Sequence, residues 1–118
     1  MMTPVFERLP ELVNANAALV RRGRYLTVTF LVTRGETHYL VRVVEGRVER
    51  VERGPFLMRD WRFAIRASEE AWQKFWEPVP EPGYQDLLAM AKFGHALVEG
   101  DLLVFMQHLR YVQEVLAA

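Results

Sequence analysis

The sequence predicts an α+β fold, in which helices pack on one face of a mainly antiparallel five-stranded sheet. Apolar residues recur at helical spacing near both ends of the chain, and between residues 24 and 66 they alternate with polar residues. Short glycine turns separate the alternating runs, as they do in antiparallel sheets. Because 118 residues is the length of one domain, we expect a single domain over residues 1–118.

The N-terminal segment predicts a helix over Leu9–Arg22. Pro10 lies in its first turn, where the N–H that proline lacks would have no partner within the helix. Gly23 follows at a position where glycine commonly ends helices. The apolar residues of this segment form one stripe: Leu9, Leu12, Val13, Leu19 and Val20.

Four strands are predicted next, joined as an antiparallel meander with one buried face. They cover Arg24–Thr33, Thr37–Glu45, a short segment with Val48 and Val51, and Trp61–Arg66. The buried face would carry Leu26, Val28, Phe30, Val32, Tyr39, Val41, Val43, Trp61, Phe63 and Ile65. The other face would carry Thr27, Thr29, Arg42, Arg62 and Arg66. Leu31, Leu40 and Val44 also fall on that polar face, and their apolar surface is left unexplained.

Helices dominate the rest of the chain. Ser68 is the expected N-cap of a helix whose first turn holds two glutamates and whose apolar side holds Ala71, Trp72, Phe75 and Trp76. Pro78, Pro80 and Pro82 then predict an extended loop that ends at Gly83. The elements that follow are a short helix over Asp86–Phe93, a short strand over Ala96–Glu99, and a helix from Leu102 to about Leu116, capped by Asp101.

The last helix carries two apolar rows. The first is Leu102, Phe105, Met106, Leu109, Val112 and Leu116, and the second is Val104, His108, Tyr111 and Val115. One stripe is enough to pack a helix on a sheet. The second row would line a cavity, meet a second subunit or touch a membrane, unless the helix is simply well buried.

Two segments resemble the most recognisable stretches of the sterol carrier protein 2 (SCP-2) family. In Ala96-Leu97-Val98-Glu99-Gly100-Asp101-Leu102-Leu103, a short edge strand turns through Gly-Asp into a C-terminal amphipathic helix. In Phe63–Trp72, a strand ends in a serine that caps a tryptophan-bearing helix. The similar order and spacing extend over roughly Leu9 to Leu116, nearly the whole chain. The Pro78–Gly83 loop and the helix after it look more like bacterial stand-alone relatives than like the animal carriers.

The resemblance implies an apolar tunnel between the inner face of the sheet and the helices, with the last helix near its mouth. Its ligand would be a hydrophobic small molecule: a lipid, a fatty acyl chain, an isoprenoid or a sterol-like compound. The residues expected to line the tunnel are Val28, Phe30, Val43, Phe63, Ile65, Trp72, Phe75, Trp76, Leu87, Met90, Phe105, Met106, Leu109 and Val112. Ordinary core packing is the alternative for these residues, and the sequence leaves it open.

The sequence offers no constellation that supports catalysis or a metal site. His38, His95 and His108 are isolated from one another, and no cysteine is present. Ser68 is the only serine and lacks a Gly-x-Ser-x-Gly context, so we interpret it as a helix cap. We therefore expect no enzyme activity, no cofactor and no metal.

Charge and hydropathy restrict the partners further. Fifteen basic and fifteen acidic residues balance without a basic block, which argues against nucleic-acid binding. The N-terminus has no signal-peptide core, and the longest apolar run, Leu102–Met106, is too short to span a bilayer. We expect a cytoplasmic protein with at most transient membrane-surface contact.

The sequence thus predicts non-enzymatic binding or transfer of a hydrophobic ligand. Two alternatives remain at this point. One is an accessory module that presents a lipid to a partner enzyme. The other is a dimerisation domain that would use Leu31, Leu40 and the second row of the last helix, which leaves a homodimer open.

Overall fold

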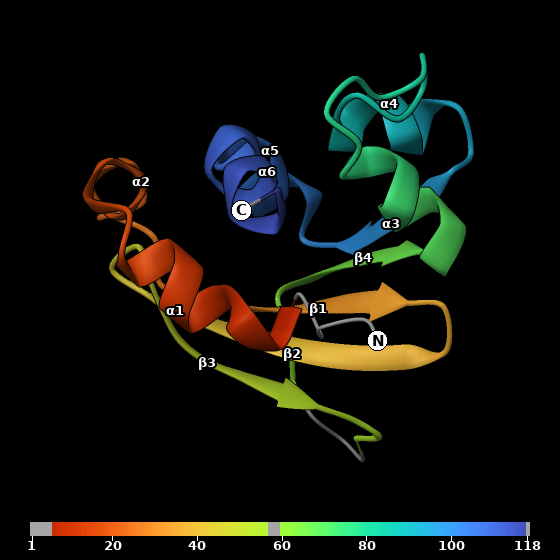
Figure 1. The fold of residues 1–118 in the computed structure, drawn as a ribbon. Helices are drawn as coiled ribbons and strands as arrows, with labels where there is room; N and C mark the ends of the chain where they lie inside the picture. Colours follow the sequence, from red (N-terminus) through yellow and green to blue (C-terminus); the bar gives the residue numbers. More distant parts are fainter. Residues whose placement is uncertain (1–5, 57–59, 118) are drawn as a thin grey trace.

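The computed structural model describes residues 6–56 and 60–117, and its centre is a five-stranded mixed sheet (Figure 1). The spatial order of the strands is β3-β2-β1-β4-β5. Three of the neighbouring pairs are antiparallel, and β1 with β4 is parallel. The predicted fold, α+β with a mainly antiparallel sheet, is confirmed. The strands are β1 (Val28–Arg34), β2 (Thr37–Val44), β3 (Arg47–Arg53), β4 (Phe63–Ala67) and β5 (Ala96–Gly100).

Helices cover one side of this sheet, as Figure 1 shows. Phe6, from a short 3₁₀ segment before the first helix, is buried in the same core as Leu116 near the other end of the chain. One core between the sheet and the helices therefore includes both end regions of the described chain. The helical elements are η1 (Phe6–Arg8), α1 (Leu9–Asn14), α2 (Ala17–Arg22), α3 (Glu69–Phe75), α4 (Leu87–Lys92), α5 (Leu102–Gln107) and α6 (Leu109–Leu116).

The predicted inward face of the first two strands is confirmed by register and burial. Val28 lies opposite Val43 and Phe30 lies opposite Val41, and all four side chains are buried. The alternation of apolar and polar residues along these strands therefore reflects the pleat of a sheet that has helices on one side.

The predicted meander is wrong for the fourth strand. β4 does not extend the sheet beyond β3 but pairs in parallel with β1, with Ile65 beside Val32. The chain that leaves the edge strand β3 at Arg53 therefore re-enters the sheet at Phe63, on the far side of β1. Alternation specifies which face a side chain takes, but it does not specify which strand lies next to it.

This connection explains the apolar residues on the polar face. Leu31, Leu40 and Ala64 form a small buried cluster there, and Phe56 and Trp61 pack against it. Trp61 was predicted to face the main core and instead belongs to this second cluster. The dimerisation surface predicted from Leu31 and Leu40 is also wrong, because both side chains are buried within the chain.

The first predicted helix is interrupted. α1 ends at Asn14, whose side-chain amide pairs with the backbone N–H and C=O of Val48 at 2.9 and 3.0 Å. Asn16 then takes an extended conformation and caps α2 by accepting from the Leu19 N–H. Asparagine side chains compete well for such backbone hydrogen bonds, so the predicted helix is divided into α1 and α2.

The last predicted helix is interrupted too, at His108. The break changes which side chains face inward, and the two predicted rows are not continuous. Leu102 and Met106 of the first row are about half exposed, at 50% and 49%, while Tyr111 and Val115 of the second row are buried. A row of side chains predicted for one continuous helix does not stay on one face when the helix is broken.

The predicted caps Ser68 and Asp101 are confirmed, and Asp86 caps α4 in the same way, a role that the sequence analysis did not assign. The side chains of Ser68, Asp86 and Asp101 accept hydrogen bonds from the backbone N–H groups three residues on, at 3.1, 2.6 and 3.2 Å. Each cap satisfies one of the donors that a helix start leaves without an internal partner. Each also turns the chain at a helix start, so α3, α4 and α5 begin at defined points of the fold.

Tyr111 joins α6 to the turn between β2 and β3. Its hydroxyl donates to the Gly46 carbonyl at 2.6 Å, and Gly46 in turn donates its N–H to the Leu26 carbonyl. Gly46 has a φ of +83°, and a Cβ there would lie 2.3 Å from the carbonyl oxygen of Val20. Glycine is therefore required at this turn both for its conformation and for the close approach of α2.

Gly46→Ala should lower the free energy of unfolding far more than Gly94→Ala. Both glycines have a positive φ, so both substitutions carry a conformational cost of roughly 1 to 2 kcal/mol. A Cβ at Gly94 meets nothing within 4 Å, whereas the one at Gly46 meets backbone. Urea unfolding should show an additional loss of about 2 kcal/mol or more for Gly46→Ala. Equal losses would mean that the turn and α2 can move apart freely.

Tyr111 should also make the stability of the protein fall at alkaline pH. Burial raises the pKa of the Tyr111 phenol to about 12, above the ordinary value of 10.0. Its contribution is complete below about pH 10 and is lost as pH rises toward 12, because only the unfolded chain ionises in that interval. At about pH 11, between the two pKa values, the expected loss is about 1 kcal/mol.

Urea unfolding at about pH 8 and about pH 11 tests this expectation in Tyr111→Phe. The variant should lose about 1 kcal/mol at the lower pH, from the missing hydrogen bond, and should show a smaller alkaline decline than the wild type. Tyr25→Phe is the matched control, because Tyr25 is 84% exposed. If the alkaline decline in the free energy of unfolding is unchanged in Tyr111→Phe, the decline is caused by other groups.

Candidate ligand-binding interior

The residues predicted to line a tunnel come together in the main core, with one exception. Val28, Phe30, Val43, Phe63 and Ile65 form its sheet side, and the helices contribute Trp72, Phe75, Leu87, Met90, Phe105 and Val112, all of them buried. Trp76 and Leu109 are partly buried and pack against this core. Met106 is the exception, because it lies on the outer side of α5.

Two aromatic groups organise this interior. Phe30 and Phe63 stack across β1 and β4 with ring centroids 5.0 Å apart, and Phe105 of α5 meets Phe63 edge-on at 5.5 Å. The second group centres on Trp72, which stacks on Trp76 at 5.8 Å and meets Phe75 edge-on. The aromatic side chains that the sequence placed together are thus in direct contact.

Phe6 is a core residue that the sequence analysis missed. It is buried and meets Tyr39, Trp72 and Trp76 edge-on, with ring centroids 5.3 to 5.5 Å away. The signal was weak because Phe6 precedes the periodic segment and lies in a single 3₁₀ turn. Its position closes the end of the interior near the start of α1.

Both indole N–H groups of this apolar region donate to backbone carbonyls. The Trp72 Nε1–H donates to the Thr33 carbonyl at 2.8 Å, and the Trp76 Nε1–H donates to the Leu116 carbonyl at 2.8 Å. The first bond attaches α3 to the sheet and the second attaches α3 to the end of α6. Both tryptophans therefore keep fixed orientations, with their rings available to the interior.

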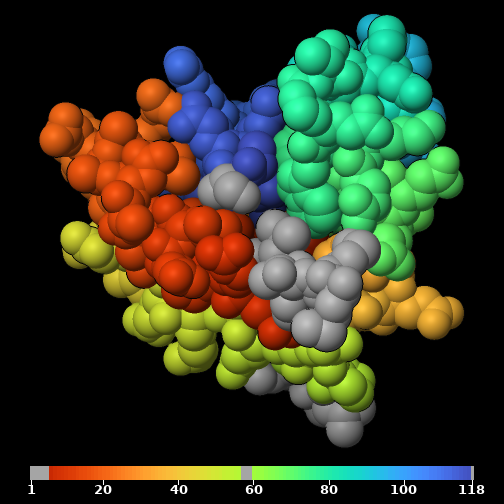
Figure 2. Space-filling view, viewed as in Figure 1, coloured from red at the N-terminus to blue at the C-terminus, as the bar shows by residue number. Residues whose placement is uncertain are grey.

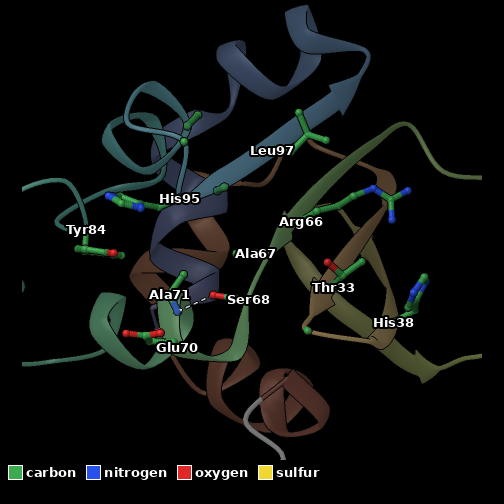
Figure 3. A pocket seen from close by; sticks show the side chains of 14 residues that line it. Thr33, His38, Arg66, Ala67, Ser68, Glu70, Ala71, Tyr84, His95 and Leu97 are labelled. Atoms are coloured by element: carbon green, nitrogen blue, oxygen red, sulfur yellow. Dashed lines mark hydrogen bonds between the residues drawn. The ribbon is translucent and has the colours of Figure 1, made fainter.

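An open cavity of about 860 Å³ lies elsewhere, where β1, β4 and β5 meet α3 and α4 (Figure 3). Its lining is mixed, with the polar or charged side chains of Thr33, His38, Arg66, Glu70 and Tyr84 among the residues that surround it. None of the predicted tunnel residues lines it. The sequence could have indicated part of it, because Thr33 and Arg66 alternate with buried residues on their strands.

The register of the strands explains this cavity. His38, Thr33, Arg66 and Leu97 are consecutive partners across β2, β1, β4 and β5, so they form one row on the polar face. Arg66 is paired with Glu99 on the same face. On the helical side of the cavity, His95 stacks on Tyr84 with ring centroids 4.1 Å apart. This mixed and open surface suits a polar molecule better than a lipid chain.

The described residues hold no group of three or more His, Cys, Asp or Glu side chains that could bind a metal ion. Within the same residues, no helix has the length and apolarity needed to cross a membrane.

Comparison with solved structures identifies the arrangement of sheet and helices. A crystal structure of sterol carrier protein 2 superimposes with a TM-score of 0.75 at 12% identity, covering 98% of this chain and 92% of the other. The chain has the fold of the SCP-2 domains. A Thermus thermophilus protein described as possibly a sterol carrier protein gives a TM-score of 0.73 at 13% identity, with 98% and 85% of the two chains covered. The UbiJ-SCP2 ubiquinone synthesis protein gives 0.60 at 18% identity, with 91% and 88% covered.

Sequence comparisons add nothing to this likeness. No family model matches the chain, and no curated protein matches it. The predicted SCP-2 fold is confirmed by the structures, and identities below a fifth establish that fold alone.

Phe105→Ala should be much more destabilising than Met106→Ala. Phe105 is 3% exposed and packs on Phe63, so its truncation leaves a void that costs about 3 to 5 kcal/mol. Met106 is its helical neighbour but is half exposed, and its truncation should change stability by less than about 1 kcal/mol. Thermal and urea unfolding of the ligand-free protein would measure both. Similar small losses would show that the Phe105 site is loosely packed.

Proposed function

We propose that this protein binds a hydrophobic ligand between the inner face of its sheet and its helices, without catalysing a reaction. The observation that carries the proposal is the SCP-2 fold, shared over nearly the whole chain with sterol carrier protein 2 and with a protein described as possibly a sterol carrier protein. The interior between the sheet and the helices is lined by aromatic and aliphatic side chains and by Met90. These surfaces bind lipid chains through apolar burial and shape.

Rings that touch across this interior would have to separate to admit a lipid chain, so the proposed site opens for its ligand. An empty apolar void costs roughly 24 cal/mol per Å³, so a lipid-sized cavity is expected to close when nothing occupies it. Each methylene that enters contributes about 0.8 kcal/mol, so ten of them contribute about 8 kcal/mol toward reopening it. Ligand binding would therefore require one covering element to move.

Helix α5 is the element that we assign to this movement. α6 is held by Tyr111 to the β2–β3 turn, by the Leu116 carbonyl to Trp76, and by the Gln113 side chain to the Leu87 N–H. α5 contributes one buried side chain, Phe105, while the helix break at His108 separates it from α6. Moving α5 thus disrupts far fewer contacts than moving α6. Figure 2 shows a hollow on this side of the molecule, between the blue C-terminal helices and the green segment that contains α3.

An accessory role, in which the protein presents its ligand to a partner enzyme, is the second candidate. It is favoured by three apolar side chains on the outer side of α5, those of Leu102, Leu103 and Met106, which are 49% to 67% exposed. One structural neighbour is described as a ubiquinone synthesis protein, which also favours a role beside an enzyme. The identity of the ligand, the cytoplasmic location and the oligomeric state stay predictions.

Quenching by a brominated fatty acid should locate the ligand, because bromine quenches an indole only near contact. Of the three tryptophans, Trp72 and Trp76 face the interior while Trp61 lies on the opposite side of the sheet. Saturable quenching should persist in Trp61→Phe, in which both remaining indoles are interior. It should weaken in Trp76→Phe.

The same fatty acid without bromine controls for fluorescence changes caused by binding alone. Native mass spectra of the freshly purified protein would show whether lipid from the host is already bound and must first be extracted. Quenching that disappears in Trp61→Phe would place the ligand on the polar face and refute the interior site. Absence of saturable quenching and of any bound lipid mass would refute lipid binding altogether.

A further inference from the structure

A smaller cavity of about 370 Å³ lies on the face of the sheet that the helices do not cover. It is lined by Thr27, Val28 and Thr29 of the segment leading into and through β1, by Arg42 of β2, and by Asp60, Trp61 and Arg62, which precede β4. The proposed lipid interior is on the opposite face, since Phe30 and Val43 alternate with Thr29 and Arg42 along their strands. One ligand cannot occupy both sites.

Two arginines in this cavity flank one threonine. On one side, Arg42 of β2 is the strand partner of Thr29. On the other side, the backbone N–H of Arg62 donates to the Thr29 carbonyl at 2.8 Å. Adjacent strands are about 4.8 Å apart, so the two arginine backbones are separated by roughly 10 Å. Side chains of this length can direct both guanidinium groups at one small molecule above Thr29.

Arg42 is a half-buried cation without a carboxylate partner. Its guanidinium donates to the Thr29 hydroxyl at 3.1 Å, and none of the described acidic residues forms an ion pair with it. Other arginines of this face are compensated, since Arg66 pairs with Glu99 and Arg50 pairs with Glu52. A partly desolvated guanidinium that donates only to a neutral hydroxyl is stabilised less than one paired with an anion.

Arg62 adds a second positive charge to the same cavity. Its Nε lies 3.9 Å from Asp101, whose other carboxylate oxygen already caps α5. Asp60 also lines the cavity, but it forms an ion pair with neither Arg42 nor Arg62. An anion placed between the arginines would reduce their mutual repulsion and accept hydrogen bonds from both.

We propose that this cavity binds a small molecule through its carboxylate or phosphate group, held between Arg42 and Arg62. Guanidinium groups match the oxygens of both anions in paired hydrogen bonds, and the Thr27 and Thr29 hydroxyls are further donors. The anion is either a free solute or the headgroup of an anionic lipid at a membrane surface. The site does not depend on the lipid-binding interior, and either can exist without the other.

Titration with inorganic phosphate at constant ionic strength, followed by calorimetry or by amide NMR shifts, tests the site. The wild type should bind saturably, with shifts centred on Thr29 and Arg42. Arg42→Gln and Arg62→Gln should each weaken binding about tenfold, the effect of losing one charge-assisted contact. Arg47→Gln removes the same charge from an exposed position outside the cavity and should change the affinity less than twofold.

Asp60→Asn provides a test in the opposite direction, which misfolding cannot imitate. Removing this negative charge from the cavity should strengthen phosphate binding severalfold. Sedimentation with vesicles of phosphatidylglycerol, compared with phosphatidylcholine, distinguishes the two sources of the anion. Vesicle binding that Arg42→Gln abolishes and Arg47→Gln retains would identify a headgroup, and phosphate binding without vesicle binding would identify a soluble ligand.

Two results would overturn the proposal. One is the absence of saturable binding to either phosphate or anionic vesicles. The other is an equal loss of binding in Arg42→Gln and Arg47→Gln, which would show that only the general positive charge of the face matters. Urea unfolding of each variant without phosphate establishes that the comparison is made on folded protein.

Discussion

The contact of Trp72 with the end of β1 is the interaction on which the arrangement of the C-terminal helices depends. Its indole N–H donates to the Thr33 carbonyl while its ring is fully buried against the sheet, so α3 has one position and one rotation. Trp76, one turn later, stacks on that ring and donates to the Leu116 carbonyl. The position of α6 therefore follows from α3. Phe6 packs on both tryptophans and brings the N-terminal segment to the same place.

The sheet separates two surfaces with different chemistry. Its helical side is an apolar interior in which aromatic rings touch one another, and it is the place proposed for a hydrophobic ligand. Its other side carries arginines, threonines and a small apolar cluster, and it has open polar cavities. A strand that alternates apolar and polar residues contributes to both surfaces, so a change in its register would damage both at once.

The parallel pair of β1 and β4 makes this division possible. Since β4 returns beside β1, the segment between β3 and β4 brings Phe56 and Trp61 onto the polar face, where they pack against Leu31 and Leu40. The residues before β4 also place Arg62 beside Thr29, where it lines the smaller cavity. The two edge strands of the sheet differ. β3 is rich in paired charges, whereas β5 is followed by α5, whose outer side exposes apolar residues. Charged edge strands resist unwanted pairing, so partners are expected at the β5 end.

The sequence by itself determined the elements that depend on local chemistry. The alternation of Val28, Phe30 and Val32 specified a strand and its inward face, and Ser68 and Asp101 specified where helices begin, because these effects involve residues only a few positions apart. It also predicted most of the side chains that meet in the interior. Tertiary structure alone decided which strand lies beside β1, where the last helix breaks, and which apolar residues of α5 stay exposed. Those features depend on contacts between residues distant in the sequence, such as Trp76 with Leu116 and Tyr111 with Gly46, and no local pattern encodes them.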